Sequence, residues 1–113
     1  MGLYRVFTDD DGASRLEDLS GSDHPLLSER LPATGVFLKR FPAGTSLPPH
    51  PAPRRMVCVM VSGVLEAGFP DGTVQRFVPG DVRLMEDTRG GGHTTRVVGD
   101  EEVVVAVVPL ADG

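Results

Sequence analysis

The sequence is poor in cysteine, in lysine and in long apolar runs. Cys58 is its single cysteine, so an internal disulfide framework and a cysteine-only metal site are excluded, and the residue is best explained as a small buried side chain. Lys39 is the only lysine, the formal net charge is -5, and no basic stretch occurs. Nucleic acid and anionic membranes are therefore not expected as partners.

Apolar runs of membrane-spanning or signal-peptide length are also missing. No segment approaches the roughly 20 apolar residues that cross a bilayer, and residues 1–10 contain no signal-like apolar run. We therefore expect a cytoplasmic protein. The length of 113 residues, without internal repeats, predicts a single domain over residues 1–113 with one core and one pocket.

Turn-forming residues interrupt the sequence at short intervals, and apolar runs of strand length lie between them. This arrangement predicts an all-β sandwich or barrel. Asp71-Gly72, between two strand-like runs, predicts a hairpin. The predicted strands cover residues 3–8, 36–41, 56–61, 64–69, 73–78, 82–86, 93–98 and 102–109.

Residues 13–34 are less regular than the rest of the chain. Their leucines could line one face of a helix or belong to a long covering loop, and we describe the segment as a candidate lid over one mouth of the barrel. His24 lies in this segment, and we expect it at the surface.

One group of residues has the spacing of a known motif: Gly44, His50, Ala52, Met56 and Gly63. It resembles the first motif of the cupin superfamily, where these positions hold a glycine, two histidines in His-x-His, a glutamate and a second glycine. Only the glycines and the first histidine are retained here. Two of the usual metal-binding side chains are therefore replaced.

A second group is similar to the second cupin motif. It consists of the turn Pro79-Gly80-Asp81, the strand over 82–86, three glycines and His93, with a loop about two residues longer than usual. The asparagine position of that motif falls at Val97. The two motifs span residues 44–97, and the resemblance implies a cupin double-stranded β-helix, a jelly-roll-like barrel, with His50 and His93 in one pocket.

The strand over 56–61 predicts the apolar lining of that pocket. Alternation places Met56, Cys58 and Met60 on one face, which the family register implies is the inner face. Arg54 is in phase with Met56, and either Arg54 or Arg55 could bind a carboxylate, phosphate or enolate oxygen. A solvated strand end or an ion pair across a dimer interface explains these arginines equally well.

The ligand set of a typical cupin metal site is incomplete in this sequence. Such a site uses three imidazoles and a carboxylate to hold Fe, Mn, Zn or Ni. His50 and His93 with Glu86, or with its neighbour Asp87, could still form a two-histidine, one-carboxylate site. Because an acidic pair before glycines is also typical of a solvated turn, we expect no cofactor and keep a divalent metal as the alternative.

Two imidazoles in an apolar pocket can take up and release protons near neutral pH. We therefore predict a metal-poor cyclase or isomerase that uses His50 and His93 on a hydrophobic, carbonyl-rich small molecule in secondary metabolism. The alternatives are an iron-dependent dioxygenase and a non-catalytic ligand-binding module. The strand over 102–109 is apolar on both faces, which predicts a second subunit and hence a homodimer.

Overall fold

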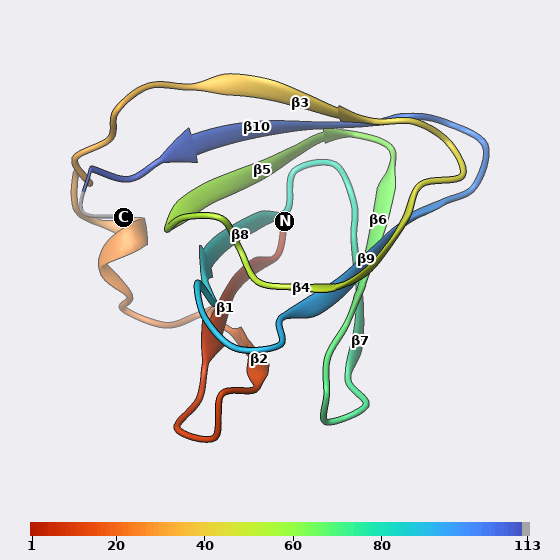
Figure 1. Cartoon of the computed structure of the whole chain (residues 1–113). Coiled ribbons are helices and arrows are strands. Elements are labelled where there is room, and N and C mark those ends of the chain that lie inside the picture. The colour runs from red at the N-terminus through yellow and green to blue at the C-terminus, as the bar shows by residue number, and fades with distance from the viewer. Residues whose placement is uncertain (112–113) are drawn as a thin grey trace.

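The structure is a computed structural model that describes residues 1–111, and it consists of two β-sheets packed face to face (Figure 1). One sheet has six strands in the order β2-β1-β8-β5-β10-β3, and the other has four in the order β4-β9-β6-β7. The strands are β1 (Leu3–Thr8), β2 (Ser14–Asp18), β3 (Phe37–Phe41), β4 (Ser46–His50), β5 (Met56–Ser62), β6 (Val64–Gly68), β7 (Val74–Phe77), β8 (Val82–Glu86), β9 (His93–Val98) and β10 (Val103–Pro109).

The core lies between the inner faces of the two sheets. In β10, Val103, Val105 and Val107 are buried while the residues between them are partly exposed, as expected when alternate side chains point to opposite faces. They join apolar residues of the smaller sheet such as Leu65 and Phe77 in one cluster. This burial confirms the predicted all-β class and the sandwich-like architecture.

All eight predicted strands are present, and no strand end differs from its predicted position by more than one residue. The predicted hairpin is confirmed: β6 and β7 pair antiparallel from Leu65 opposite Phe77 to Gly68 opposite Val74. Gly72 closes the turn with a positive φ of 88°, a conformation that costs glycine little.

Two strands escaped prediction, each for an identifiable reason. The strand β4 contains Pro48 and Pro49, which we read as a turn; it is an edge strand, and its register with β9 is irregular between Leu47 and His50. An edge strand with such an interruption tolerates residues that lack an N–H donor. The strand β2 is short and mostly polar, and it is also an edge strand.

The description of residues 13–34 as a lid is therefore wrong for Ser14–Asp18, which pairs with β1. Beyond β2, the only helical element among residues 1–111 is the single 3-10 turn η1 (Pro25–Leu27). His24 is not merely a surface residue, because its Nδ1 accepts a hydrogen bond from the Leu26 N–H at 3.1 Å and so caps this turn. No helix within residues 1–111 is long and apolar enough to cross a membrane.

Candidate functional site

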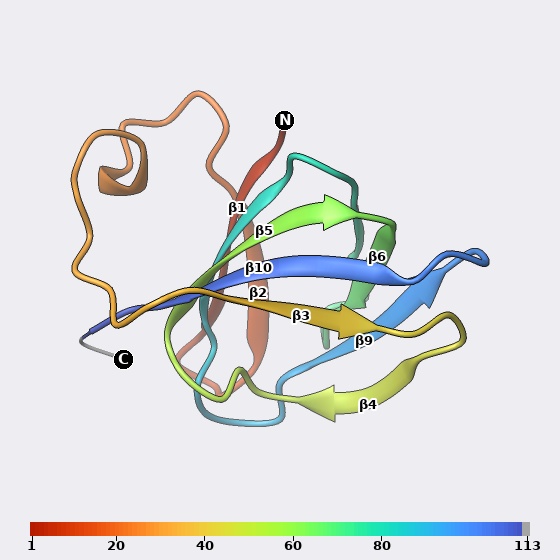
Figure 2. The ribbon, with the colours of Figure 1, turned by 90° about the horizontal axis from the view of Figure 1, so that it is seen from above.

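A cavity of about 420 Å³ opens between the two sheets. Its walls come from β3, β4, β5, β8, β9 and β10 and from the segment that joins β4 to β5. Figure 2 shows β3 and β4, the edge strands of the two sheets, along the same side of the barrel. Most of the lining is apolar, and His50 and His93 are among the polar groups that reach it.

His50 and His93 are brought together by the pairing of β4 with β9, where they are directly opposite each other. Their ring centroids are 4.9 Å apart. The approach depends on Gly92, which has a φ of 79° and lies so close to β4 that an added Cβ would be 1.9 Å from the carbonyl carbon of His50. Gly92 therefore determines how closely the two histidines approach.

His93 is held by a buried carboxylate. Its Nδ1 lies 2.6 Å from Oδ2 of Asp87, and the Ser14 hydroxyl donates to the same oxygen at 2.6 Å. Asp87 and Ser14 are fully buried, and His93 is 4% exposed. An ionised Asp87 accepts from the Nδ1–H of His93, which leaves the lone pair of the neutral ring on Nε2.

His50 has the same tautomer for a different reason. Its Nδ1 lies 2.9 Å from the carbonyl oxygen of Pro48, and because a carbonyl only accepts, Nδ1 must carry the proton. The neutral His50 ring therefore also has its lone pair on Nε2. Both rings of the pair thus keep Nε2 available to take a proton or bind an electrophile.

The predicted apolar lining is divided between the cavity and the core. Met56 and Cys58 line the cavity, whereas Met60 is buried deeper in the hydrophobic core. Burial raises the pKa of the Cys58 thiol above its ordinary value of 9.0, so this side chain stays a neutral thiol near pH 7. Cys58 therefore acts as an apolar part of the lining.

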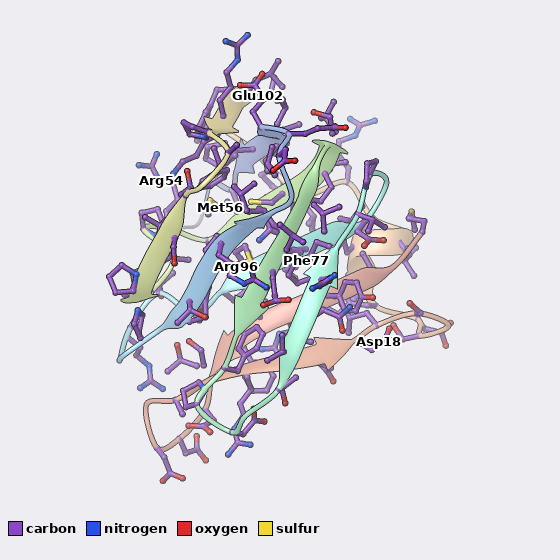
Figure 3. The ribbon with its side chains drawn as sticks, turned by 90° about the vertical axis from the view of Figure 1, so that its right-hand side faces the viewer. Asp18, Arg54, Met56, Phe77, Arg96 and Glu102 are labelled. Atoms are coloured by element: carbon purple, nitrogen blue, oxygen red, sulfur yellow. The ribbon has the colours of Figure 1, made fainter. Side chains whose placement is uncertain are left out.

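The two arginines that follow Pro53 have different positions. Arg54 lines the cavity together with Met56, and Figure 3 shows the two residues in the same region of the barrel. Arg55 is outside the lining, and its Nε donates to Glu86. The structure therefore separates the two arginines that the sequence could not distinguish.

Glu86 is not the carboxylate beside the histidines. Its two oxygens accept from Nε of Arg5, at 2.6 Å, and from Nε of Arg55. Burial alone would raise the pKa of Glu86, but the hydrogen bonds from these arginines outweigh burial and lower the pKa below its ordinary value of 4.5. Strand alternation explains why Asp87, and not Glu86, lies beside His93. In β8 Met85 points inward and Glu86 outward, so the next inward position belongs to Asp87.

The donor set does not fit a tightly held metal ion. A catalytic metal usually has three protein ligands, and the cavity supplies two imidazoles, because Ala52 and Met56 occupy the other motif positions. Asp87 does not line the cavity; its Oδ2 is shared by Ser14 and His93, and its Oδ1 is buried without a partner among residues 1–111. No cluster of three or more His, Cys, Asp or Glu side chains that could hold a metal occurs within residues 1–111.

Sequence reasoning missed four residues of the site. Ser14 supports Asp87, Arg83 is buried beside the cavity, and Phe37 and Lys39 line the cavity from β3. Strand alternation was the available signal for three of them, because Arg83 is in phase with Met85, and Phe37 and Lys39 are in phase with each other. None of residues 13–34 lines the cavity, although we expected a lid from this segment.

Comparisons with known proteins match this architecture at the level of structure. No family model matches the sequence, and a search of curated proteins found no match. The cupin domain of Schizosaccharomyces pombe Cnp3 is 18% identical, with a TM-score of 0.53, over 99% of this chain and 84% of that one. A cupin domain from Bordetella pertussis is 17% identical, with a TM-score of 0.48, over 96% of this chain and 92% of that one. An RmlC-like cupin from Desulfovibrio desulfuricans is 17% identical, with a TM-score of 0.43, over 96% of this chain and 83% of that one. The chain has the cupin fold.

Proposed function

We propose that this protein is a small-molecule-binding cupin that uses His50 and His93 for acid–base catalysis, as a cyclase or isomerase of an apolar, carbonyl-containing substrate. The observation that carries the proposal is the pair of imidazoles, with ring centroids 4.9 Å apart, at a largely apolar cavity of about 420 Å³. That volume suits a drug-sized ligand, and apolar walls with few polar groups are typical of such sites.

The two histidines differ in their support, which suggests their roles. Asp87 holds His93 in one tautomer and stabilises the imidazolium that forms when its Nε2 takes a proton. We therefore assign His93 as the base that removes a proton from the carbon next to the substrate carbonyl. His50 lacks a carboxylate partner, since its Nδ1 donates to the Pro48 carbonyl, and we assign it as the acid.

The proposed step conserves protons and electrons. The C–H electron pair forms a carbon–carbon double bond, the carbonyl π pair moves to oxygen, and the Nε2–H of protonated His50 donates to that oxygen. Return of the proton to another carbon completes an isomerisation, whereas attack of the enol carbon on a second carbonyl closes a ring. Apolar walls exclude water and so strengthen the hydrogen bonds that direct these transfers.

The test is hydrogen exchange in D2O with methyl phenylpyruvate, a neutral α-keto ester that carries a phenyl group, followed by proton NMR. Wild-type protein is expected to accelerate exchange at the carbon beside the ketone, and His50→Ala or His93→Ala should each slow it at least tenfold. His24→Ala is the matched control, because His24 lies outside the cavity and should leave the rate unchanged. No acceleration over buffer, or equal rates in wild type and the double histidine variant, would contradict the proposal.

A non-catalytic binding module is the competing function, and the apolar lining favours it. Burial of an apolar ligand would then supply most of the affinity, independently of the histidines. Calorimetric titration of the double variant separates the two functions. Binding without any wild-type exchange activity would identify a binding module, whereas exchange that depends on the histidines identifies a catalyst.

A further inference from the structure

The feature that the proposed chemistry leaves unexplained is the buried side chain of Arg83. It is 6% exposed, although arginine is almost never buried without a partner. It points to the inner face of β8, directly opposite Cys58 of β5, and it lines the cavity. Burial lowers the pKa of Arg83, but a guanidinium remains protonated near neutral pH.

Arg83 has no anionic partner within residues 1–111. Its Nε is buried without a hydrogen-bond acceptor in the described part of the chain, and the centroid of the Phe77 ring lies 4.8 Å from the guanidinium carbon. Phe77 is labelled in Figure 3. A cation–π contact alone is a weak compensation for a buried charge.

The acidic side chains nearest along the chain form no ion pair with Arg83. Asp81 accepts from the backbone N–H groups of Gly2 and Val78. Asp87 accepts from Ser14 and His93 through Oδ2, while its Oδ1 is buried without a hydrogen-bond partner among residues 1–111. They attract Arg83 only over a longer distance, without an ion pair. A buried charge that is left without a counterion in the protein favours an anion from outside.

The other charged residues of the cavity have the same sign. Lys39 and Arg54 line it with Arg83, and no Asp or Glu within residues 1–111 is part of the lining. This is notable in a chain with 16 acidic and 11 basic residues. The cavity therefore concentrates positive charge while the molecule as a whole is acidic, which favours entry of an anionic ligand.

We propose that Arg83 is the anion subsite of this cavity and that the ligand is an apolar small molecule bearing a carboxylate. The planar guanidinium matches a carboxylate with two parallel hydrogen bonds, and the apolar walls contact the rest of the ligand. The inference rests on the proposed small-molecule cavity and is independent of the acid–base chemistry. Arg83 fixes the position of the carboxylate and so orients the ligand in the cavity.

Calorimetric titration with phenylpyruvate and its methyl ester tests this subsite, because the two compounds differ only at the carboxylate, whose charge the methyl group of the ester removes. The acid is expected to bind wild type at least tenfold more tightly than the ester, and Arg83→Met should abolish the preference. Arg76→Met is the matched control, because Arg76 is outside the cavity, exposed and paired with Glu66. Arg76→Met should keep the preference.

The melting temperature of ligand-free protein distinguishes a ligand subsite from a structural arginine. Arg83→Met should melt at the same temperature as wild type or higher, since it replaces an unpaired buried charge by an apolar side chain. A clear decrease would reveal a structural role for Arg83 and contradict the subsite. So would equal affinity of wild type for acid and ester, absence of binding, or a preference that survives in Arg83→Met.

Failure of the subsite and failure of the proposed catalysis have different readouts. Exchange of the neutral ester depends on the histidines, whereas the acid-to-ester affinity ratio depends on Arg83. Hydrogen exchange on the ester, without tighter binding of the acid, overturns the anion subsite alone. A preference that depends on Arg83, without exchange, supports the subsite and overturns the acid–base proposal.

Discussion

Nδ1 of His93 lies 2.6 Å from Oδ2 of Asp87, in a contact that is almost completely buried. The two residues begin and end the glycine-rich loop between β8 and β9, so the loop closes on its own hydrogen bond. Ser14 of β2 donates to the same carboxylate oxygen. The catalytic proposal therefore depends on a side chain supplied by an edge strand as well as on the two motif histidines.

Asp87→Asn tests whether this carboxylate sets the tautomer of His93. The amide keeps the shape but can donate to Nδ1, which would move the ring proton to Nε2 and remove the base. We expect hydrogen exchange on the ester to slow at least tenfold, because a positioned general base contributes roughly 10²- to 10⁴-fold to a rate. Nitrogen NMR of His93 should show the tautomer change.

The control for that experiment is Glu86→Gln, the neighbouring carboxylate that pairs with arginines outside the cavity. It should leave both the exchange rate and the His93 spectrum unchanged. Equal loss of exchange in the two variants would indicate a general structural effect and refute the assigned role of Asp87.

Gly92→Ala tests the close approach of β9 to β4. The new Cβ would lie 1.9 Å from the His50 carbonyl carbon, and the backbone φ of 79° is unfavourable for alanine. We expect a loss of about 1–3 kcal/mol in the free energy of unfolding, measured with urea, together with slower exchange. Gly91→Ala is the control, since no atom lies within 4 Å of its added Cβ, and a similar loss there would argue against this explanation.

The pH dependence of stability tests the ion pairs of Glu86. Because its pKa is lower in the folded state than the ordinary value of 4.5, Glu86 stabilises the fold above about pH 4.5, and this contribution is lost as the pH falls through the folded-state pKa. The free energy of unfolding in urea should therefore fall more steeply below pH 4.5 for wild type than for Glu86→Gln. Parallel pH profiles would show that the arginines do not stabilise the ionised form.

Elemental analysis tests the metal alternative. Two imidazoles without a third donor predict well under one equivalent of Fe, Mn, Zn or Ni in protein purified without a histidine tag or chelator. Addition of a chelator should leave the rate of hydrogen exchange on the ester unchanged. Near one equivalent of metal in wild type, lost in the double variant of His50 and His93, would instead favour the iron-dependent dioxygenase and require a donor that joins the histidines.

We propose a homodimer formed through β3, one of the two edge strands of the larger sheet. Its outward residue Leu38 is 67% exposed, and its neighbour Val36 is 68% exposed. An unpaired apolar edge favours pairing with a second copy. Light scattering should give twice the chain mass for wild type and a single chain mass for Leu38→Glu. Val74→Glu is the control, at an exposed position on β7, an edge strand of the smaller sheet, and it should remain a dimer. Monomeric wild type would contradict the dimer.

The local part of the fold could be predicted because strands and turns are short-range features. Alternating apolar residues indicated eight of the ten strands, and Asp71-Gly72 indicated the hairpin that joins β6 to β7. The motif spacing singled out His50 and His93, which the structure indeed brings together. These features depend on a period of two residues and on turn chemistry, both of which are visible in one chain.

The partners of the histidines were decided by tertiary structure. Ser14 hydrogen-bonds to Asp87 across 73 residues of sequence, and Arg83 has no ion-pair partner among residues 1–111, although Asp81 and Asp87 lie near it along the chain. Such contacts depend on strand register and on the way in which the two sheets face each other, and a period along one strand does not contain that information. The sequence alone therefore indicated eight of the ten strands and the two histidines. The packing of the sheets decided which carboxylate supports His93 and which charge the cavity contains.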